Sequence, residues 1–165
     1  MPWYVNILII AVLFYFNGIF AMYEIAMVSA KKTRLQQRKD DGNQGAAAAL
    51  ELLEDPYQRY LSAIQVMITL LDTLAGGIGG ANLSMPLANV LRTVPLLTGA
   101  ADLLALILVV LVITYFSIVC GELIPKRIAV NEPDDVVCRL SPSIRNLTKV
   151  RSEEHTSELQ SHLNL

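Results

Sequence analysis

The stretch LLALILVVLVITYFSIVCGELIPK, residues 103–126, decides the fold. Its first part, from Leu103 to Cys120, contains no charged side chain. At a rise of about 1.5 Å per residue, and with help from its flanks, a helix of this length crosses a hydrocarbon core of roughly 30 Å. We therefore predict a transmembrane helix over about residues 103–124.

Two further apolar blocks precede this one. Trp3 to Tyr23 carries no charge, and Tyr60 to Leu91 carries a single charge, Asp72. The first block lacks a basic leading region and a clear cleavage site, so we interpret it as a retained helix over about residues 3–29. In the second we expect a span over about residues 60–80. Its regular helix should end near Leu74, before a glycine-rich break and a short helix or re-entrant segment.

The composition supports a membrane protein. Hydrophobic residues make up 53% of the 165 residues, and charged residues make up 17%, against about 25% in an ordinary globular protein. The mean hydropathy is +0.46. With a net charge of −2 there is no basic excess to meet phosphates, which argues against a nucleic-acid partner. Cys120 and Cys138 give neither a disulfide framework nor a metal-ligand spacing.

The distribution of basic residues predicts the orientation in the membrane. A basic cluster follows the first block and a basic pair follows the third, whereas the loop between the second and third blocks has one basic residue. In that order these residues are Lys31, Lys32, Arg34, Arg38 and Lys39; Lys126 and Arg127; and Arg92. Because cytoplasmic flanks carry the excess of Lys and Arg, we predict an outside N-terminus, three crossings and a cytoplasmic C-terminus.

The polar segments predict helices at the inner surface. Residues 40–42 (Asp-Asp-Gly) indicate a turn, residues 44–54 are rich in alanine and leucine and favour a short helix, and Asp55-Pro56 should stop it. Residues 132–150 read as an amphipathic helix lying on the inner surface, with a break near Pro142. The predicted fold class is an all-α membrane protein with three transmembrane helices, short inner helices and a juxtamembrane helix.

The sequence of the last residues indicates that they have a different origin from the rest of the chain. Residues 151–162 read RSEEHTSELQSH, which resembles the translation of a common sequencing adapter. We interpret residues 1–150 as one membrane domain and residues 151–165 as an artefact rather than a native polar tail. Without that tail, acidic and basic residues are equal in number and no histidine remains. The commonest general base is then missing, so we do not expect an enzyme.

Three acids lie in or beside the apolar blocks: Glu24, Asp72 and Glu122. A carboxylate near the centre of a span costs on the order of 2.5–3.5 kcal/mol, so each needs an offsetting partner. Pro125 has no N–H and cannot bond the carbonyl of Gly121, which leaves a backbone oxygen beside Glu122 at an expected kink. Oxygen ligands with one carboxylate suit a hard cation such as Mg²⁺. Alternatively, Glu122 pairs with a lysine where the helix ends.

In each of the three blocks, polar side chains share one helix face. In the third block, Thr114 and Ser117 share a face with Gly121. In the second, the steps between polar residues are typical of one helical stripe, which either lines a cavity or makes interhelical hydrogen bonds. In the first, Glu24 either pairs with Lys31 or Lys32 or lines a site. The stripe of the second block consists of Ser62, Gln65, Thr69 and Asp72, and the face of the first holds Asn17, Ala21 and Glu24.

Three segments together resemble one family of membrane proteins. They are NGIFAMYEIAMVSA (residues 17–30), SAIQV (62–66) and, most specifically, ITYFSIVCGELIPKR (113–127). The chain resembles the CorC/CNNM family, often labelled hemolysin-like (HlyC/CorC), over nearly all of residues 1–150. The resemblance implies a homodimeric domain of a bacterial-type plasma membrane, with three crossing helices, short inner helices and a juxtamembrane helix. Cytoplasmic CBS domains would follow it in the whole protein.

The resemblance also implies Mg²⁺ or Co²⁺ efflux or homeostasis, with Na⁺ as counter-ion. The family's Gly-Glu-x-x-Pro motif falls on Gly121, Glu122 and Pro125. The implied metal ligands are Glu122, Gly121, Ser117, Asp72, Thr69 and Ser62, with Glu24 as an accessory acid. The chain departs from the family's pattern in the first block at Ala21 and Tyr23, where hydroxyls are usual. In the second block it departs at Ile68 and Thr69, where asparagines are common, and at Asp72, where a neutral residue is usual. One alternative function is a membrane anchor that senses ions without moving them. A second, suggested by the family label alone, is a membrane-lysing toxin, but the stable membrane spans argue against it.

Overall fold

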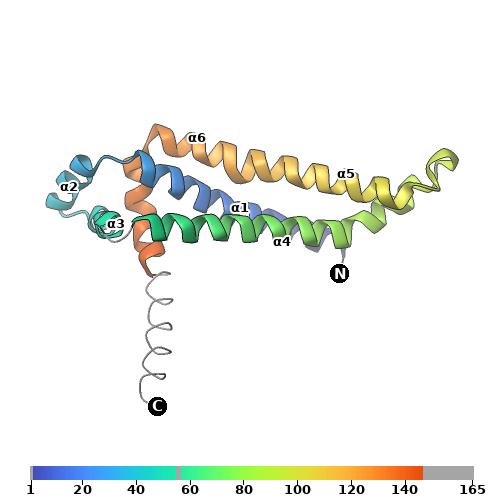
Figure 1. Ribbon diagram of the computed structural model, residues 1–165, viewed down its shortest axis with the longest axis horizontal. Helices are drawn as coiled ribbons and strands as arrows, with labels where there is room; N and C mark the ends of the chain where they lie inside the picture. Colours follow the sequence, from blue (N-terminus) through green and yellow to red (C-terminus); the bar gives the residue numbers. More distant parts are fainter. Residues whose placement is uncertain (1, 55–56, 147–165) are drawn as a thin grey trace, which may run out of the picture.

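The computed structural model describes residues 2–54 and 57–146, and in these ranges every regular element is a helix. Three long runs lie side by side along the molecule (Figure 1). They are α1 (Trp3–Ser29), α4 (Tyr57–Leu91), and a run made of α5 (Ala101–Phe116), the π-helix η2 (Ser117–Leu123) and α6 (Ile124–Asn131). All three are long and apolar enough to cross a membrane. The predicted fold class is confirmed.

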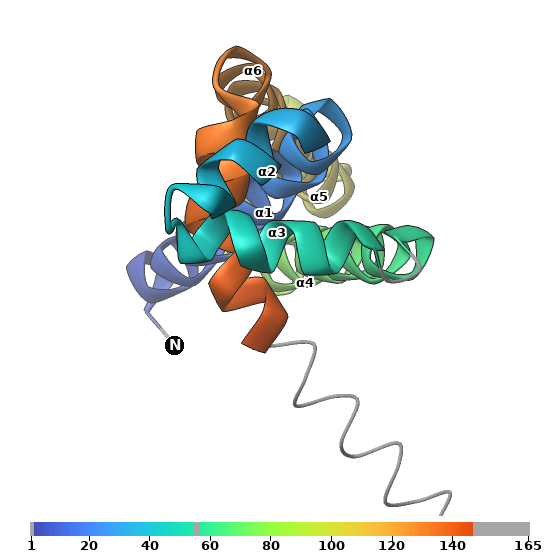
Figure 2. The same ribbon diagram turned by 90° about the vertical axis from the view of Figure 1, so that its left-hand side faces the viewer.

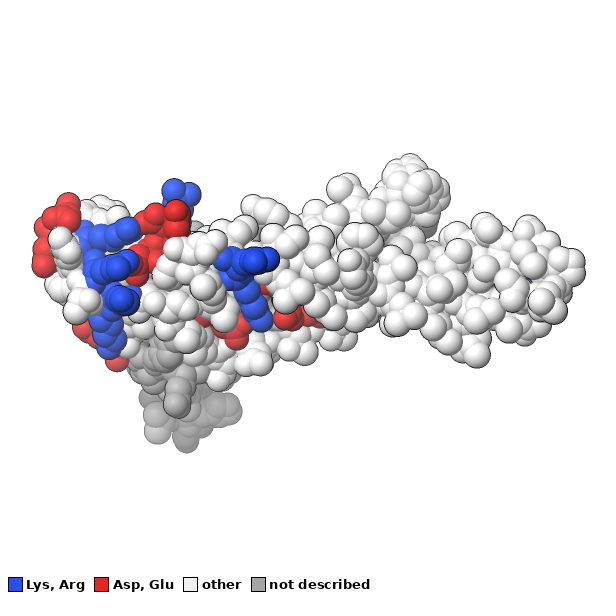
Figure 3. Space-filling view, turned by 90° about the horizontal axis from the view of Figure 1, so that it is seen from above, with Lys and Arg blue, Asp and Glu red and all other residues white. Residues whose placement is uncertain are grey.

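The surface of these helices is that of a protein in lipid. Large apolar side chains are exposed along every span, among them Leu8 of α1, Leu70 of α4 and Leu111 of α5. Soluble monomers rarely expose contiguous apolar surface of this extent. Charged side chains instead gather at the end that carries α2 and α3, with a smaller group nearer the middle (Figure 3). The other half of the face in that view is almost entirely uncharged.

The predicted glycine-rich break in the second span is wrong. The helix α4 continues through all four glycines and through Pro86 to Leu91. Within lipid an unpaired backbone group costs several kcal/mol, whereas a glycine in a helix costs only about 0.5–1 kcal/mol. The continuous helix is therefore the more stable form. Within it, Gly79 lies directly against the Ile113 side chain of α5.

The third run widens where the sequence predicted a kink. The residues Ser117–Leu123 form a π-helix, and the N–H of Ile124 bonds the carbonyl of Val119, five residues back. Pro125 follows in the first turn of α6, where its missing N–H does least harm. Single-turn π-segments inside α-helices occur frequently at functional sites.

A cap of three short helices covers one end of the long helices (Figure 2). It consists of α2 (Lys32–Asp40), α3 (Gln44–Glu54) and the juxtamembrane helix, residues 133–146. Gly42 makes the predicted turn between the first two with φ of +88°. The helix α3 has the predicted bounds, whereas Asp55-Pro56 and residues 151–165 lie outside the described residues.

The predicted break near Pro142 is absent, since residues 133–146 are helical throughout. Proline removes the N–H that would bond the carbonyl of Cys138. That carbonyl lies against Gly45, where any Cβ would collide with it. The neighbouring α3 thus covers the backbone that Pro142 interrupts.

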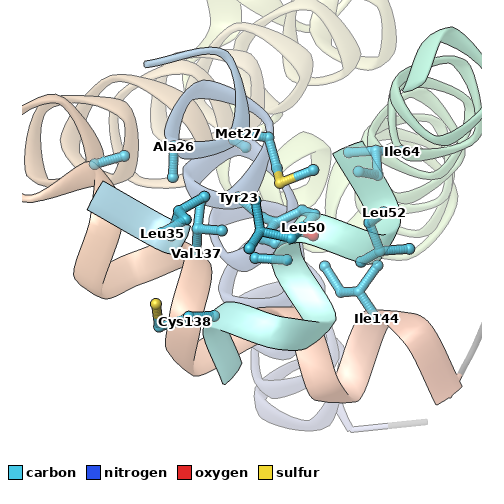
Figure 4. Close-up of a cluster of buried hydrophobic side chains, with 14 of the residues drawn as sticks. Tyr23, Ala26, Met27, Leu35, Leu50, Leu52, Ile64, Val137, Cys138 and Ile144 are labelled. Carbon is cyan, nitrogen blue, oxygen red and sulfur yellow. The ribbon is translucent and has the colours of Figure 1, made fainter. Parts of the chain in front are cut away.

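Apolar packing and ion pairs join the cap to the spans. Tyr23 and Met27 of α1, Leu35 of α2, Leu50 of α3 and Val137 of the juxtamembrane helix form one buried cluster (Figure 4). Around its edge, acidic side chains of the juxtamembrane helix bind the start of the cap. Asp134 accepts from the backbone N–H of Lys31 at 3.2 Å and pairs with Arg34 at 3.3 Å, and Asp135 pairs with Arg38.

Candidate functional site

A cavity of about 310 Å³ opens where α1, α4 and the third run meet. Its wall contains three carboxylates, from Glu24, Asp72 and Glu122, and one ammonium group, from Lys126. The remaining lining residues come from α4 and are Gln65, Ile68, Thr69 and Thr73. The polar face of each span thus contributes to one cavity, as their shared spacing in the sequence suggests.

Asp72 ties the three spans together. Its Oδ1 accepts a hydrogen bond from Asn17 Nδ2 of α1 at 2.9 Å and another from the Ser117 hydroxyl of η2. Hydrogen bonds to a charged group contribute about 1.5–3 kcal/mol each, which is enough to offset the cost of an acid in a span. The two donors therefore explain how Asp72 is tolerated.

Glu24 and Glu122 share one cation, the side chain of Lys126. The Lys126 Nζ lies 3.3 Å from Glu122 Oε2 and 3.8 Å from Glu24 Oε2. Glu122 therefore pairs with a lysine and also lines the cavity, whereas its role as a cation ligand stays a prediction. Glu24 also lines the cavity, and the structure pairs it with Lys126 rather than with the expected Lys31 or Lys32.

The candidate metal ligands divide into two groups. Glu122, Asp72 and Thr69 line the cavity, and Ser117 reaches it through its bond to Asp72. Gly121 is buried beside them in η2. Ser62 lies apart, in a neighbouring open hollow of about 510 Å³ on the flank of α4 that also contains Gln65 and Thr69.

Pro125 packs against the helix α1 next to the site. Its ring lies against Gly18 of α1, where a Cβ would come within 3.0 Å of the Pro125 Cγ. At Gly121 a Cβ would lie 2.9 Å from Asn17 Nδ2. Two glycines, one on each helix, therefore let α1 approach the π-helix closely enough for Asn17 to reach Asp72.

Asn17 belongs to the site, although the sequence placed it only on one face with Glu24 and not among the expected ligands. It is fully buried, and its Oδ1 has no hydrogen-bond partner among the described residues. A buried amide oxygen without a partner is rare and calls for an explanation. Two features of the sequence indicate a role for Asn17 in the site. It shares one helix face with Glu24, and it is a polar amide in the centre of an apolar block.

The carboxylates do not by themselves form a metal centre. Within residues 2–54 and 57–146, no three Asp, Glu, His or Cys side chains are grouped closely enough to hold a metal ion. A cation in the cavity would therefore also need neutral oxygens or its own water. The cavity wall offers neutral oxygens on Gln65, Thr69 and Thr73, and those of Asn17 and Ser117 lie behind it, beside Asp72.

Comparison with known proteins identifies the family to which the chain belongs. Residues 8–152 match the cyclin M transmembrane N-terminal domain, CNNM. The chain belongs to the CNNM family. This confirms the resemblance drawn from residues 17–30, 62–66 and 113–127.

Relatives with CNNM domains extend the comparison. A UPF0053 protein of Synechocystis is 46% identical over 82% of this chain, and a polyamine export protein of Haemophilus influenzae is 31% identical over 79%. The UPF0053 protein YhdP of Bacillus subtilis is 28% identical over 80%. The chain spans 30% of the length of each relative. The region described here is thus a membrane domain shared by larger proteins.

Proposed function

We propose that this CNNM domain binds a hydrated divalent cation such as Mg²⁺ in the cavity between its three spans and forms the transport pathway of a cation exporter. The observation that carries the proposal is the meeting of Glu24, Asp72 and Glu122 in one cavity at membrane depth. Ionisable residues inside a membrane protein commonly mark ion pathways. The function proposed is binding and transport rather than catalysis.

The donor set suits Mg²⁺ better than a softer metal. Mg²⁺ is a hard cation that takes oxygen ligands, keeps several waters and uses only one or two carboxylates. The orphaned Asn17 Oδ1 supports the proposal, because a cation or its water would satisfy that atom. In the proposed site, Glu122 and Asp72 supply charge, and Asn17, Thr69, Ser117 and Gly121 supply neutral oxygens, whereas Ser62 stays outside it.

The whole protein is proposed to work as a homodimer with its C-terminus in the cytoplasm. The open hollow on the flank of α4 holds Ser62, Gln65, Thr69 and Thr73 beside apolar side chains. Polar side chains on the outside of a span favour helix–helix contact over lipid contact. A second copy would cover this flank, and CBS domains that follow the membrane domain would regulate the dimer.

The decisive experiment replaces Glu122. In the complete protein, Glu122→Gln should abolish the protection of cells against high Mg²⁺ while expression stays unchanged. Affinity measured by isothermal titration should fall at least about tenfold, since even residues that only support metal ligands cost that much. The control is Glu132→Gln, which removes an exposed acid outside the cavity. Unchanged protection and affinity in Glu122→Gln would refute the proposed ligand.

Two other functions give different results in the same assays. A membrane anchor that only senses ions would bind Mg²⁺ but show no flux in liposomes that hold the complete protein. A polyamine is the second candidate cargo, since one relative is named a polyamine export protein. The cavity already holds an ammonium group, that of Lys126, against two glutamates. Liposome flux of spermidine in place of Mg²⁺ would select this cargo.

A further inference from the structure

Lys126 occupies the position where a cation would neutralise two glutamates. It follows Glu122 by one helical turn, and its Nζ reaches Oε2 of both Glu122 and Glu24, on two different spans. Its side chain is 32% exposed, so it lies within the wall of the cavity rather than out in solvent. Among the described residues that line the cavity, it is the one basic side chain.

The ammonium and an incoming cation need the same oxygens. A lysine carries a compact point charge on a flexible four-carbon stem, so it can leave a carboxylate without any change of the backbone. When it leaves, Glu122 and Glu24 become available as ligands or as partners for the water of a hydrated ion. While it stays, it repels any second cation within a few ångströms.

We propose that Lys126 is a tethered competitor, whose ammonium occupies the cavity when cargo is absent and is displaced when cargo binds. This inference rests on the proposed cation site and deepens it by assigning Lys126 a role in setting affinity. Without cargo, Glu24 and Glu122 are then never left uncompensated in a membrane. Cargo affinity is held low enough for release, because the lysine returns to Glu122 and Glu24.

The competing explanation is a purely structural ion pair that fixes α6 against α1. The two explanations predict opposite changes in affinity. If Lys126 only holds the helices in place, its removal loosens the cavity and weakens Mg²⁺ binding. If Lys126 competes, its removal strengthens binding, because Mg²⁺ no longer has to displace an ammonium group.

The first experiment measures Mg²⁺ affinity in the complete purified protein by isothermal titration. Lys126→Gln should bind Mg²⁺ about two- to fivefold more tightly than the natural chain, which is the effect of one partly exposed ion pair. Lys126→Arg keeps the charge and should not show this gain. The matched control is Arg127→Gln, which removes the same charge from the adjacent, exposed position outside the cavity.

The outcomes separate this inference from the proposed function. Tighter binding in Lys126→Gln alone supports the competitor. Equal or weaker binding in Lys126→Gln, or an equal gain in Arg127→Gln, overturns it while the cation site stands. No Mg²⁺ binding by the natural chain or by Lys126→Gln refutes the cation site itself, and the competitor with it.

A second measurement follows the lysine directly and does not need a variant. An amine-reactive reagent labels Lys126 slowly while its ammonium is paired with two carboxylates. Saturating Mg²⁺ should increase labelling of Lys126 severalfold, as read by mass spectrometry, with Lys31 and Lys32 of the same sample as internal references. Labelling of Lys126 that Mg²⁺ leaves unchanged, or decreases, would show that the ammonium is not displaced.

Discussion

At the residue scale, the site depends on contacts between helices that no single helix reveals. The acids Glu24, Asp72 and Glu122 stand out in the sequence because charge is costly in lipid. Lys126 does not stand out, since a lysine near a helix end is ordinary, and Asn17 shows only a weaker signal, because an uncharged amide costs less in lipid than an acid does. Their importance comes from which neighbours they meet, Asp72 in one case and two glutamates in the other.

Gly121 offers the sharpest test of this arrangement. A Cβ at this position would lie 2.9 Å from Asn17 Nδ2, so Asn17 would have to move and weaken its bond to Asp72. We expect Gly121→Ala to cost about 1–3 kcal/mol, as overpacking in a core does. Thermal unfolding in detergent should show a lower apparent Tm, and Mg²⁺ affinity should fall with it.

The matched control for Gly121 is Gly77 in α4. A Cβ at Gly77 meets no atom within 4 Å. Gly77→Ala should therefore leave the cavity unchanged and raise helix stability by up to about 1 kcal/mol. An equal loss of stability in both variants would contradict the close approach of α1 to η2 as the cause, because a Cβ at Gly77 meets no neighbour.

At the element scale, the sequence predicts helices well and interruptions poorly. The bounds of α1 and α3 follow from apolar length and from alanine-rich composition, and the structure has the same bounds. The glycines of α4 and Pro142 of the juxtamembrane helix suggested breaks that are absent. In α4, lipid and the contact with α5 favour an unbroken helix. In the juxtamembrane helix, the turn before Pro142 packs closely on Gly45 of α3.

Gly45 should therefore control how α3 packs on the juxtamembrane helix. Any Cβ at Gly45 would collide with the backbone of Cys138, so Gly45→Ala must push these helices apart. Cys138 is buried, and burial raises the pKa of its thiol, an effect that the nearby Arg38 opposes. The natural thiol should then react slowly with a maleimide at pH 7, because the reactive thiolate is scarce.

Separation of the helices should expose this thiol. In a Cys120→Ser background, Gly45→Ala should label Cys138 about tenfold faster at pH 7, which corresponds to about 1.4 kcal/mol of local stability. Raising the pH should speed labelling of the natural chain more than that of Gly45→Ala, whose exposed thiol has a pKa nearer its ordinary value. Gln44→Ala, at the exposed neighbouring position, is the control and should label at the natural rate. Equal rates in all three chains would contradict the close packing of α3.

At the scale of the whole molecule, charge is segregated along the long axis. The cap end carries the basic cluster of α2 and its acidic partners, whereas at the other end Arg92 is neutralised by Asp102 at 2.6 Å. The positive-inside rule counts Lys and Arg close to the ends of spans, so we predict that the cap faces the cytoplasm and that the loop between α4 and α5 faces outward. This orientation would place the cavity, near the basic end, within reach of cytoplasmic cations.

This orientation predicts which introduced cysteines an impermeant reagent reaches. In the complete protein with Cys120→Ser, Gly99→Cys in the α4–α5 loop should be labelled on intact cells by a membrane-impermeant maleimide. Gly99 suits the change because it is exposed and a Cβ there meets nothing within 4 Å. Asp41→Cys, exposed in the turn between α2 and α3, should be labelled only after permeabilisation. The reverse pattern would contradict the predicted orientation and would place the basic end of the cavity on the outside of the cell.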